Sequence, residues 1–268
     1  MNPVEYKSWI KGIFNRAAPA YGGKNNIYFS HFADKLVDLA KIKGPENILD
    51  VATGRGAVLK KALTKIDARG SLTAVDISPE MIQQLTEELD CQSKQVHLYC
   101  MDAEHLEFED NSFDIIFCAF GVFFFPNIHS VLTDFRRLLK PNGKLLLSTW
   151  GKKDFCHELY KIELTKLDSV PPVTLHEFEK VEFIRNILVD SGFQNLHCKL
   201  ESLDYVYPSI ENWIDSLWNL GSRGRLETLS EEQLSRLKEV LRFKLTPCLQ
   251  FDGLHETLEV IYTQATKE

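Results

Sequence analysis

Between Asn47 and Trp150, short apolar segments alternate with amphipathic helical segments, and this alternation limits the folds open to the chain more than any other feature. Most of the apolar segments are separated by a stretch with one apolar helical face. Strand and helix in regular alternation predict a mostly parallel sheet with helices on both faces. The strands expected on this basis are 47–52, 71–77, 95–101, 112–120 and 144–150.

The regions on either side of this alternation follow other patterns. The chain begins with two helical pieces around a loop at 17–26, rich in Gly, Pro and Asn. After Trp150, a helix at 178–193 precedes two long alternating stretches, 195–207 and 254–266, which predict a late pair of strands. The domain organisation expected is an N-terminal helical extension at 1–45, a core at 46–207 and 254–268, and a helical insert at 208–253.

Composition excludes several classes of protein. The 268 residues are 44% hydrophobic, enough for a large core, and the net charge of -7 argues against nucleic acid as a partner. No secretory signal pattern and no apolar stretch of about 20 residues is found, so we expect a cytoplasmic protein without a membrane span. The cysteines are scattered, which predicts neither a zinc site nor a disulfide framework. They are Cys91, Cys100, Cys118, Cys156, Cys198 and Cys248.

The segment ILDVATGRGAV, residues 48–58, contains two glycines where a strand passes into a helix. Gly54 and Gly56 leave the backbone bare, so a ligand can approach the unpaired N–H groups at the start of the helix. Asp76 ends the second strand and Asp102 follows the third. Because the carboxyl ends of parallel strands meet at one edge of a sheet, these groups predict a nucleotide site, with Asp76 positioned to accept ribose hydroxyls.

The same segment argues against a dinucleotide. The G-x-G-x-x-G pattern requires a third glycine where this chain has Leu59. Asp50 lies inside the first strand, where pyrophosphate binding does not require an acid. The ammonium group of an amino acid does require a nearby negative charge, so a nucleotide that carries an amino acid is favoured.

Five segments together resemble the successive motifs of class I S-adenosylmethionine-dependent methyltransferases. They are FNRAAPAY, ILDVATGRG, LTAVDISPEM, CMDAEHLEFEDNSFDIIFCAFGVFFF and LLKPNGKLLLSTW. The likeness is greatest to the branch that contains ubiquinone and menaquinone biosynthesis enzymes and small-molecule methyltransferases. It implies an α/β, Rossmann-like fold: a seven-stranded, mostly parallel sheet with an antiparallel last strand, and a helical lid inserted between the last two strands.

The resemblance also implies a cofactor, S-adenosyl-L-methionine, and the residues that hold it. Asp50 and the loop after it would hold the methionine moiety and Asp76 the ribose. Ile77 and Met81 would pack on the adenine, and Asp102 with Ala103 would meet its amino edge. The segment CAFGV after the fourth strand would lie along the sulfonium side. The set is Tyr21, Asp50, Ala52, Thr53, Gly54, Gly56, Asp76, Ile77, Met81, Asp102, Ala103, Cys118 and Phe120. One departure is that Ala52 replaces the usual first glycine of the loop.

For the acceptor we expect a small planar molecule, with or without a negative charge, held by aromatic and guanidinium groups of the insert and of the segment after the fourth strand. The residues expected to bind it are Phe123, Trp213, Trp218 and Arg223. Each also has a purely structural interpretation, as core packing or a solvated arginine. No general base is evident, although His129, His157 and His255 are candidates for an acceptor hydroxyl.

Three alternatives stay open at this point. A nucleic-acid or protein methyltransferase would need a basic groove or a recognition domain. A non-catalytic module would bind the cofactor without transferring methyl. A nicotinamide dehydrogenase is disfavoured by Leu59 and by the late pair of strands. The sequence leaves the oligomeric state, monomer or homodimer, undetermined.

Overall fold

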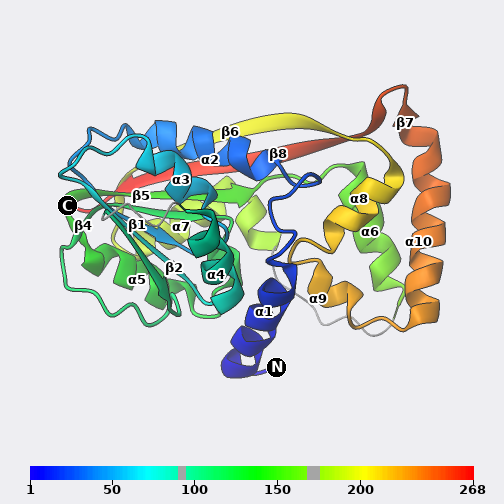
Figure 1. Cartoon of the computed structure of the whole chain (residues 1–268), viewed down its shortest axis with the longest axis horizontal. Coiled ribbons are helices and arrows are strands. Elements are labelled where there is room, and N and C mark those ends of the chain that lie inside the picture. The colour runs from blue at the N-terminus through cyan, green and yellow to red at the C-terminus, as the bar shows by residue number, and fades with distance from the viewer. Residues whose placement is uncertain (90–94, 168–175) are drawn as a thin grey trace.

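A single sheet runs along the length of the molecule in the computed structural model, which describes residues 1–89, 95–167 and 176–268 (Figure 1). Its strands are β1 (Asn47–Val51), β2 (Ser71–Asp76), β3 (Val96–Cys100), β4 (Phe113–Ala119), β5 (Leu139–Trp150), β6 (Gln194–Tyr207), β7 (Leu249–Gln250) and β8 (Gly253–Thr266). Their order is β3-β2-β1-β4-β5-β8-β6, and β7 pairs with β8.

The strand directions confirm the predicted fold class. Strands β1 to β5 pair in parallel, while β8 runs antiparallel between β5 and β6. The two-residue β7 adds an eighth strand that the sequence did not predict. Since β2 lies on one side of β1 and β4 on the other, the connections reverse direction at β1 and β4, and the carboxyl ends of these strands form the edge where ligands bind in such sheets.

Helices cover both faces of the sheet and extend beyond one end of it. They are α1 (Pro3–Ala17), α2 (Tyr28–Ala40), α3 (Ala57–Leu63), α4 (Pro79–Glu88), α5 (Ile128–Leu138), α6 (Phe155–Thr165), α7 (Val181–Asp190), α8 (Ile210–Leu217), α9 (Arg223–Leu226) and α10 (Glu231–Leu245). Short 3-10 turns are η1 (Val122–Phe124), η2 (His176–Glu179) and η3 (Thr246–Cys248). No helix in the described part of the chain is both long and apolar enough to cross a membrane.

Local start signals place two of the predicted helices. The Ser78 side chain accepts a hydrogen bond from the Met81 N–H, and Pro79 occupies the first turn of α4. Ser230 and Gln233 form a capping box at the start of α10. These side chains satisfy backbone groups that a helix terminus leaves without partners.

Two features differ from the sequence-based expectation. Residues 141–143, which precede the strand expected at 144–150, lie inside β5, where the pairing with β4 shifts register and Asn142 takes a φ of 64°. Helix α6 was not predicted. Asp154 caps it by accepting from the Cys156 and His157 N–H groups. Figure 1 shows α6 beside α8 and α10, so the helical region beyond the sheet contains more than the insert 208–253.

The central strands are the most deeply buried part of the molecule. Ile48, Leu49, Leu72 and Leu146 have no exposed surface. This agrees with their apolar runs, because a parallel sheet is covered on both faces. Five cysteines are free thiols in the described residues, as expected from their spacing, and Cys91 lies outside those residues.

Candidate cofactor and substrate pockets

The loop after β1 has an unusual backbone. Ala52, Gly54 and Gly56 have φ values of 55°, 54° and 74°, in the left-handed region that favours glycine. A Cβ atom on Gly56 would collide with Leu85 of α4, and one on Gly54 would lie 3.4 Å from Tyr21 Cε1. Leu85 therefore leaves no room for a side chain at Gly56, whereas at Gly54 the space is sufficient and the left-handed φ is what favours glycine.

Asp76 fixes this loop to the end of β2. Its carboxylate accepts hydrogen bonds from the Gly54 N–H (2.8 Å) and the Ser78 N–H (2.9 Å). The side chain is only 8% exposed, and burial raises the pKa of Asp76 to about 6. The carboxylate is thus held at the pocket edge by backbone N–H donors, and no positively charged side chain among the described residues pairs with it.

Asp50 is a second buried carboxylate close by. It is 1% exposed and accepts a 2.6 Å hydrogen bond from the Thr53 hydroxyl. Burial, with a further contribution from the charge on Asp76, raises the pKa of Asp50 to about 7. Within the described residues neither acid has an ion-pair partner. Two buried acids without a counter-ion fit a cationic ligand.

A pocket opens directly over this loop, and we call it the glycine-loop pocket. It includes most of the residues predicted to hold the cofactor: Tyr21, Ala52, Gly54, Asp76, Ile77, Met81, Asp102, Ala103 and Phe120. The other predicted residues do not line it. Asp50, Thr53, Gly56 and Cys118 are not among the lining residues, and Cys118 has no exposed surface.

Lys7 of α1 also lines the glycine-loop pocket, and the sequence analysis missed it. Its ammonium lies 2.6 Å from Asp102 Oδ2 and 3.0 Å from Glu104 Oε2. No motif marks Lys7, because the contact joins residues 95 positions apart along the chain. Helix α1 is thereby bound to the segment after β3.

The segment after α1 lies across the glycine loop. The Arg55 guanidinium donates hydrogen bonds to the Pro19 carbonyl (3.1 Å) and the Tyr21 carbonyl (3.3 Å). Burial raises the pKa of Tyr21, so its phenol is neutral at physiological pH. Tyr21 is thus held as an uncharged cover above Gly54.

A second pocket adjoins the first, and we call it the aromatic pocket. Both pockets are lined by Ile10, Phe14, Tyr21, Phe120 and Phe124. Phe120 has a φ of 53°, which is rare for a bulky residue and strained, and its ring centroid lies 4.4 Å from that of Trp150. These residues form a wall that both pockets share, so the two pockets lie side by side.

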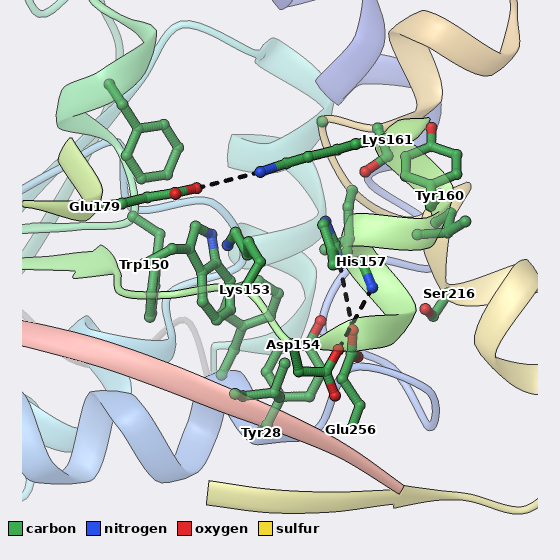
Figure 2. Close-up of a pocket in the computed structure, with 18 of the residues that line it drawn as sticks. Tyr28, Trp150, Lys153, Asp154, His157, Tyr160, Lys161, Glu179, Ser216 and Glu256 are labelled. Carbon is green, nitrogen blue, oxygen red and sulfur yellow. Dashed lines mark hydrogen bonds and ion pairs between the residues drawn. The ribbon is translucent and has the colours of Figure 1, made fainter. Parts of the chain in front are cut away.

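Charged groups gather in the part of the aromatic pocket shown in Figure 2. Lys153 lies over the Trp150 ring, with its ammonium 4.4 Å from the ring centroid. His157 Nδ1 is 3.3 Å from an oxygen of Glu256, whose side chain is buried. The pocket therefore combines aromatic walls with titratable groups able to orient a polar acceptor.

The residues predicted to bind substrate divide into two pairs. Phe123 and Trp213 line the aromatic pocket, and Trp213 is fully buried. Trp218 and Arg223 are not among its lining residues, and their role in substrate binding stays a prediction. The Arg223 guanidinium lies over the Trp218 ring and donates to Glu227 at 2.7 Å, so these side chains are occupied with each other and with α9.

Arg225, two residues further on, lines the pocket instead. Sequence alone could not choose between the two arginines, because the short helix α9 decides which of them points inward. Among the histidines, only His157 lines the pocket. His129 is exposed on α5, and His255 is bonded to Asp204 and Asp252.

Comparison with known proteins agrees with this geometry. Residues 49–147 match the family model described as a methyltransferase domain. The ubiquinone/menaquinone biosynthesis C-methyltransferase UbiE of Rickettsia bellii is 31% identical over 172 residues, 59% of this chain and 67% of the relative. This chain belongs to the class I S-adenosylmethionine-dependent methyltransferases. It is an enzyme of the ubiquinone/menaquinone branch, and its cofactor is S-adenosylmethionine.

Two further proteins are similar to this methyltransferase. The aklanonic acid methyltransferase DauC of Streptomyces sp. (strain C5) is 27% identical over 150 residues, 56% of this chain and 68% of the relative. The structure of phosphoethanolamine N-methyltransferase 2 of Haemonchus contortus, in complex with S-adenosyl-L-methionine, superimposes with a TM-score of 0.58. It has 19% identity and covers 96% of this chain and 57% of its own. At that identity the second likeness concerns the fold alone.

Proposed function

We propose that this methyltransferase binds S-adenosylmethionine in the glycine-loop pocket and methylates an oxygen, nitrogen or carbon atom of a small planar molecule in the aromatic pocket. The observation that carries the proposal is the wall of Phe14, Tyr21, Phe120 and Phe124 that the two pockets share. Because the two pockets adjoin at these residues, an acceptor atom in the aromatic pocket can approach the cofactor's methyl group directly, and the bond from the acceptor to the methyl forms as the bond from sulfur to the methyl breaks.

The residues of the glycine-loop pocket suit each part of the cofactor. Asp76 accepts from the ribose hydroxyls, Ile77 and Met81 pack on the adenine, and Asp102 with Ala103 meets its amino edge. Ala52 and Gly54 lie along the methionine moiety. The remaining predicted residues support the loop. Asp50 accepts a hydrogen bond from Thr53, Gly56 provides one of the left-handed positions, and Cys118 lies against Gly121 of the facing loop.

The cofactor supplies an electrophilic methyl group on a sulfonium. The protein's contribution is to align the acceptor with that methyl, and alignment alone supplies several kcal/mol, of the order of 7 to 11 in favourable cases. Phe120 and Tyr21 present aromatic faces to the cationic side of the cofactor and exclude water from it. His157, paired with Glu256, is the histidine placed to take a proton from an acceptor hydroxyl.

The similar proteins support a small-molecule acceptor. One is named for C-methylation in quinone biosynthesis and another for aklanonic acid. A nucleic-acid or protein acceptor is less well suited to a pocket walled by α1, α6 and α8, and the net charge of -7 provides no general attraction for polyanions.

The decisive experiment measures release of S-adenosylhomocysteine with a panel of phenols, quinols and amines. Turnover with at least one of them supports the proposal. Binding of S-adenosylmethionine without turnover on any small acceptor, together with methylation of RNA or protein from a lysate, would contradict it. Cofactor binding with no transfer at all would favour a non-catalytic module.

A further inference from the structure

Every acid that lines the aromatic pocket already has a partner. Asp154 accepts hydrogen bonds from the Cys156 and Thr257 N–H groups, each at 2.9 Å. Glu179 pairs with Lys161, and Glu256 with His157. The last of these acids, Glu259, accepts from the Lys152 N–H at 2.7 Å. The acids of the pocket are therefore already hydrogen-bonded or paired within the protein.

Two cations of the same pocket differ from these acids, because they lack such partners among the described residues. Lys153 and Arg225 make no side-chain hydrogen bond or ion pair with any residue that the structure describes. The contact of the Lys153 ammonium is with the Trp150 ring. Burial lowers the pKa of Lys153 to about 7, and the charges of Glu179 and Glu256, which lie too far away to form an ion pair with it, only partly offset this effect. Lys152 also lacks a side-chain partner, but it is exposed to solvent.

Position as well as charge singles out Lys153. It lies in the segment after β5, which ends at Trp150, and so at the carboxyl end of the sheet where the ligands of such folds bind. Its neighbour Trp150 contacts Phe120, which belongs to the wall shared with the glycine-loop pocket. A planar ligand whose anionic group lies at Lys153 would thus extend from Lys153 toward that wall.

We propose that the acceptor is a planar aromatic acid whose anionic group pairs with Lys153, with Arg225 adding a second positive charge to the pocket. This inference rests on the proposed function and adds the chemical class of the acceptor. An anion at this position restores to Lys153 the charge partner that the protein does not supply.

Calorimetry with two matched probes tests the inference. Protein saturated with S-adenosylhomocysteine is titrated with 2-naphthoate and with 2-naphthamide, which have the same ring and similar size but differ in charge. We expect the acid to bind about ten- to a hundredfold tighter, the range for one charge-assisted hydrogen bond. Lys153→Met should remove most of this preference, while binding of the amide stays as in the wild type.

Arg223→Met is the matched control for Arg225→Met, since Arg223 lies in the same short helix but is bonded to Glu227 outside the pocket. Arg225→Met should reduce the preference for the acid, and Arg223→Met should leave it unchanged. Lys153→Arg keeps the charge and should keep the preference. Affinity for S-adenosylhomocysteine reports that each variant is folded.

Equal affinity for the two probes, binding of neither, or an undiminished preference for the acid in Lys153→Met would overturn the inference. Failure of the proposed function is seen separately, as cofactor binding with no methyl transfer to any small acceptor, acidic or neutral. Transfer to neutral phenols alone would leave the proposed function standing and remove the anionic acceptor.

Discussion

The methyl group of Ala52 faces Gly121, and a Cβ atom on Gly121 would lie 2.8 Å from the Ala52 Cβ and 2.9 Å from the Cys118 sulfur. The loops after β1 and β4 touch at this point, and both line the glycine-loop pocket. The alanine that replaces the usual first glycine is thus accommodated by a glycine on the facing loop.

Gly121→Ala should force these two loops apart. We expect a loss of about 1–3 kcal/mol in the free energy of unfolding, as for other overpacked sites, with weaker cofactor binding. Ala52→Gly in the same chain should recover only part of the loss, because the Cys118 sulfur still obstructs the new methyl. Alone, Ala52→Gly relieves a left-handed alanine and should be neutral or stabilising by roughly 1 kcal/mol. Urea denaturation of the four chains checks this, and full additivity of the two changes would contradict the contact.

Asp76→Ala should weaken S-adenosylmethionine binding by about 1.5–3 kcal/mol, since it removes a charged acceptor from the ribose site and frees the Gly54 N–H. Isothermal titration gives the affinity. The control is Asp38→Ala, which removes an exposed carboxylate of α2 that is paired with Lys65. An affinity within twofold of the wild type for Asp76→Ala would rule out the ribose contact.

Asp50→Asn should make the ligand-free protein less sensitive to pH. The pKa of Asp50 rises from 3.8 to about 7 on folding, so the folded state retains the proton more strongly than the unfolded state. The wild type therefore loses stability as the pH rises from about 4 to about 7. The amide does not titrate, and we expect Asp50→Asn to gain about 1–3 kcal/mol at pH 8 and progressively less toward pH 5. Thermal denaturation across this range measures the effect, and an identical pH slope in both chains would refute it.

His157→Ala should destabilise the protein, because it leaves the buried Glu256 carboxylate without its partner. A loss of about 1–3 kcal/mol is expected at pH 7, and Glu256→Gln in the same chain should recover most of it. A double-mutant cycle by chemical denaturation gives the coupling. Additive effects would show that the pair is not coupled. His129→Ala, on the exposed face of α5, serves as the unaffected control.

The parts of the site that local patterns define could be predicted from the sequence. Gly54, Asp76 and Asp102 were found because strand ends, glycines and acids follow one another at short range, and the parallel sheet then brings them together. The two late strands were predicted from their alternating pattern, while the antiparallel direction of the last strand was implied by the family resemblance.

Residues whose role depends on distant packing were missed. Lys7 reaches Asp102 only because α1 folds back over the sheet, and the choice of Arg225 over Arg223 depends on how α9 is seated. Lys153 could have been found. The rule that singled out Asp76, a polar side chain at the carboxyl end of a parallel strand, applies equally to the residues just after β5.

Helix α1 touches both halves of the molecule: Lys7 binds Asp102 beside the sheet, and Arg16 donates to Glu227 after α9. The same N-terminal segment supplies Ile10, Phe14 and Tyr21 to both pockets. A substitution that displaces this segment would therefore change the lining of the cofactor pocket and of the acceptor pocket together.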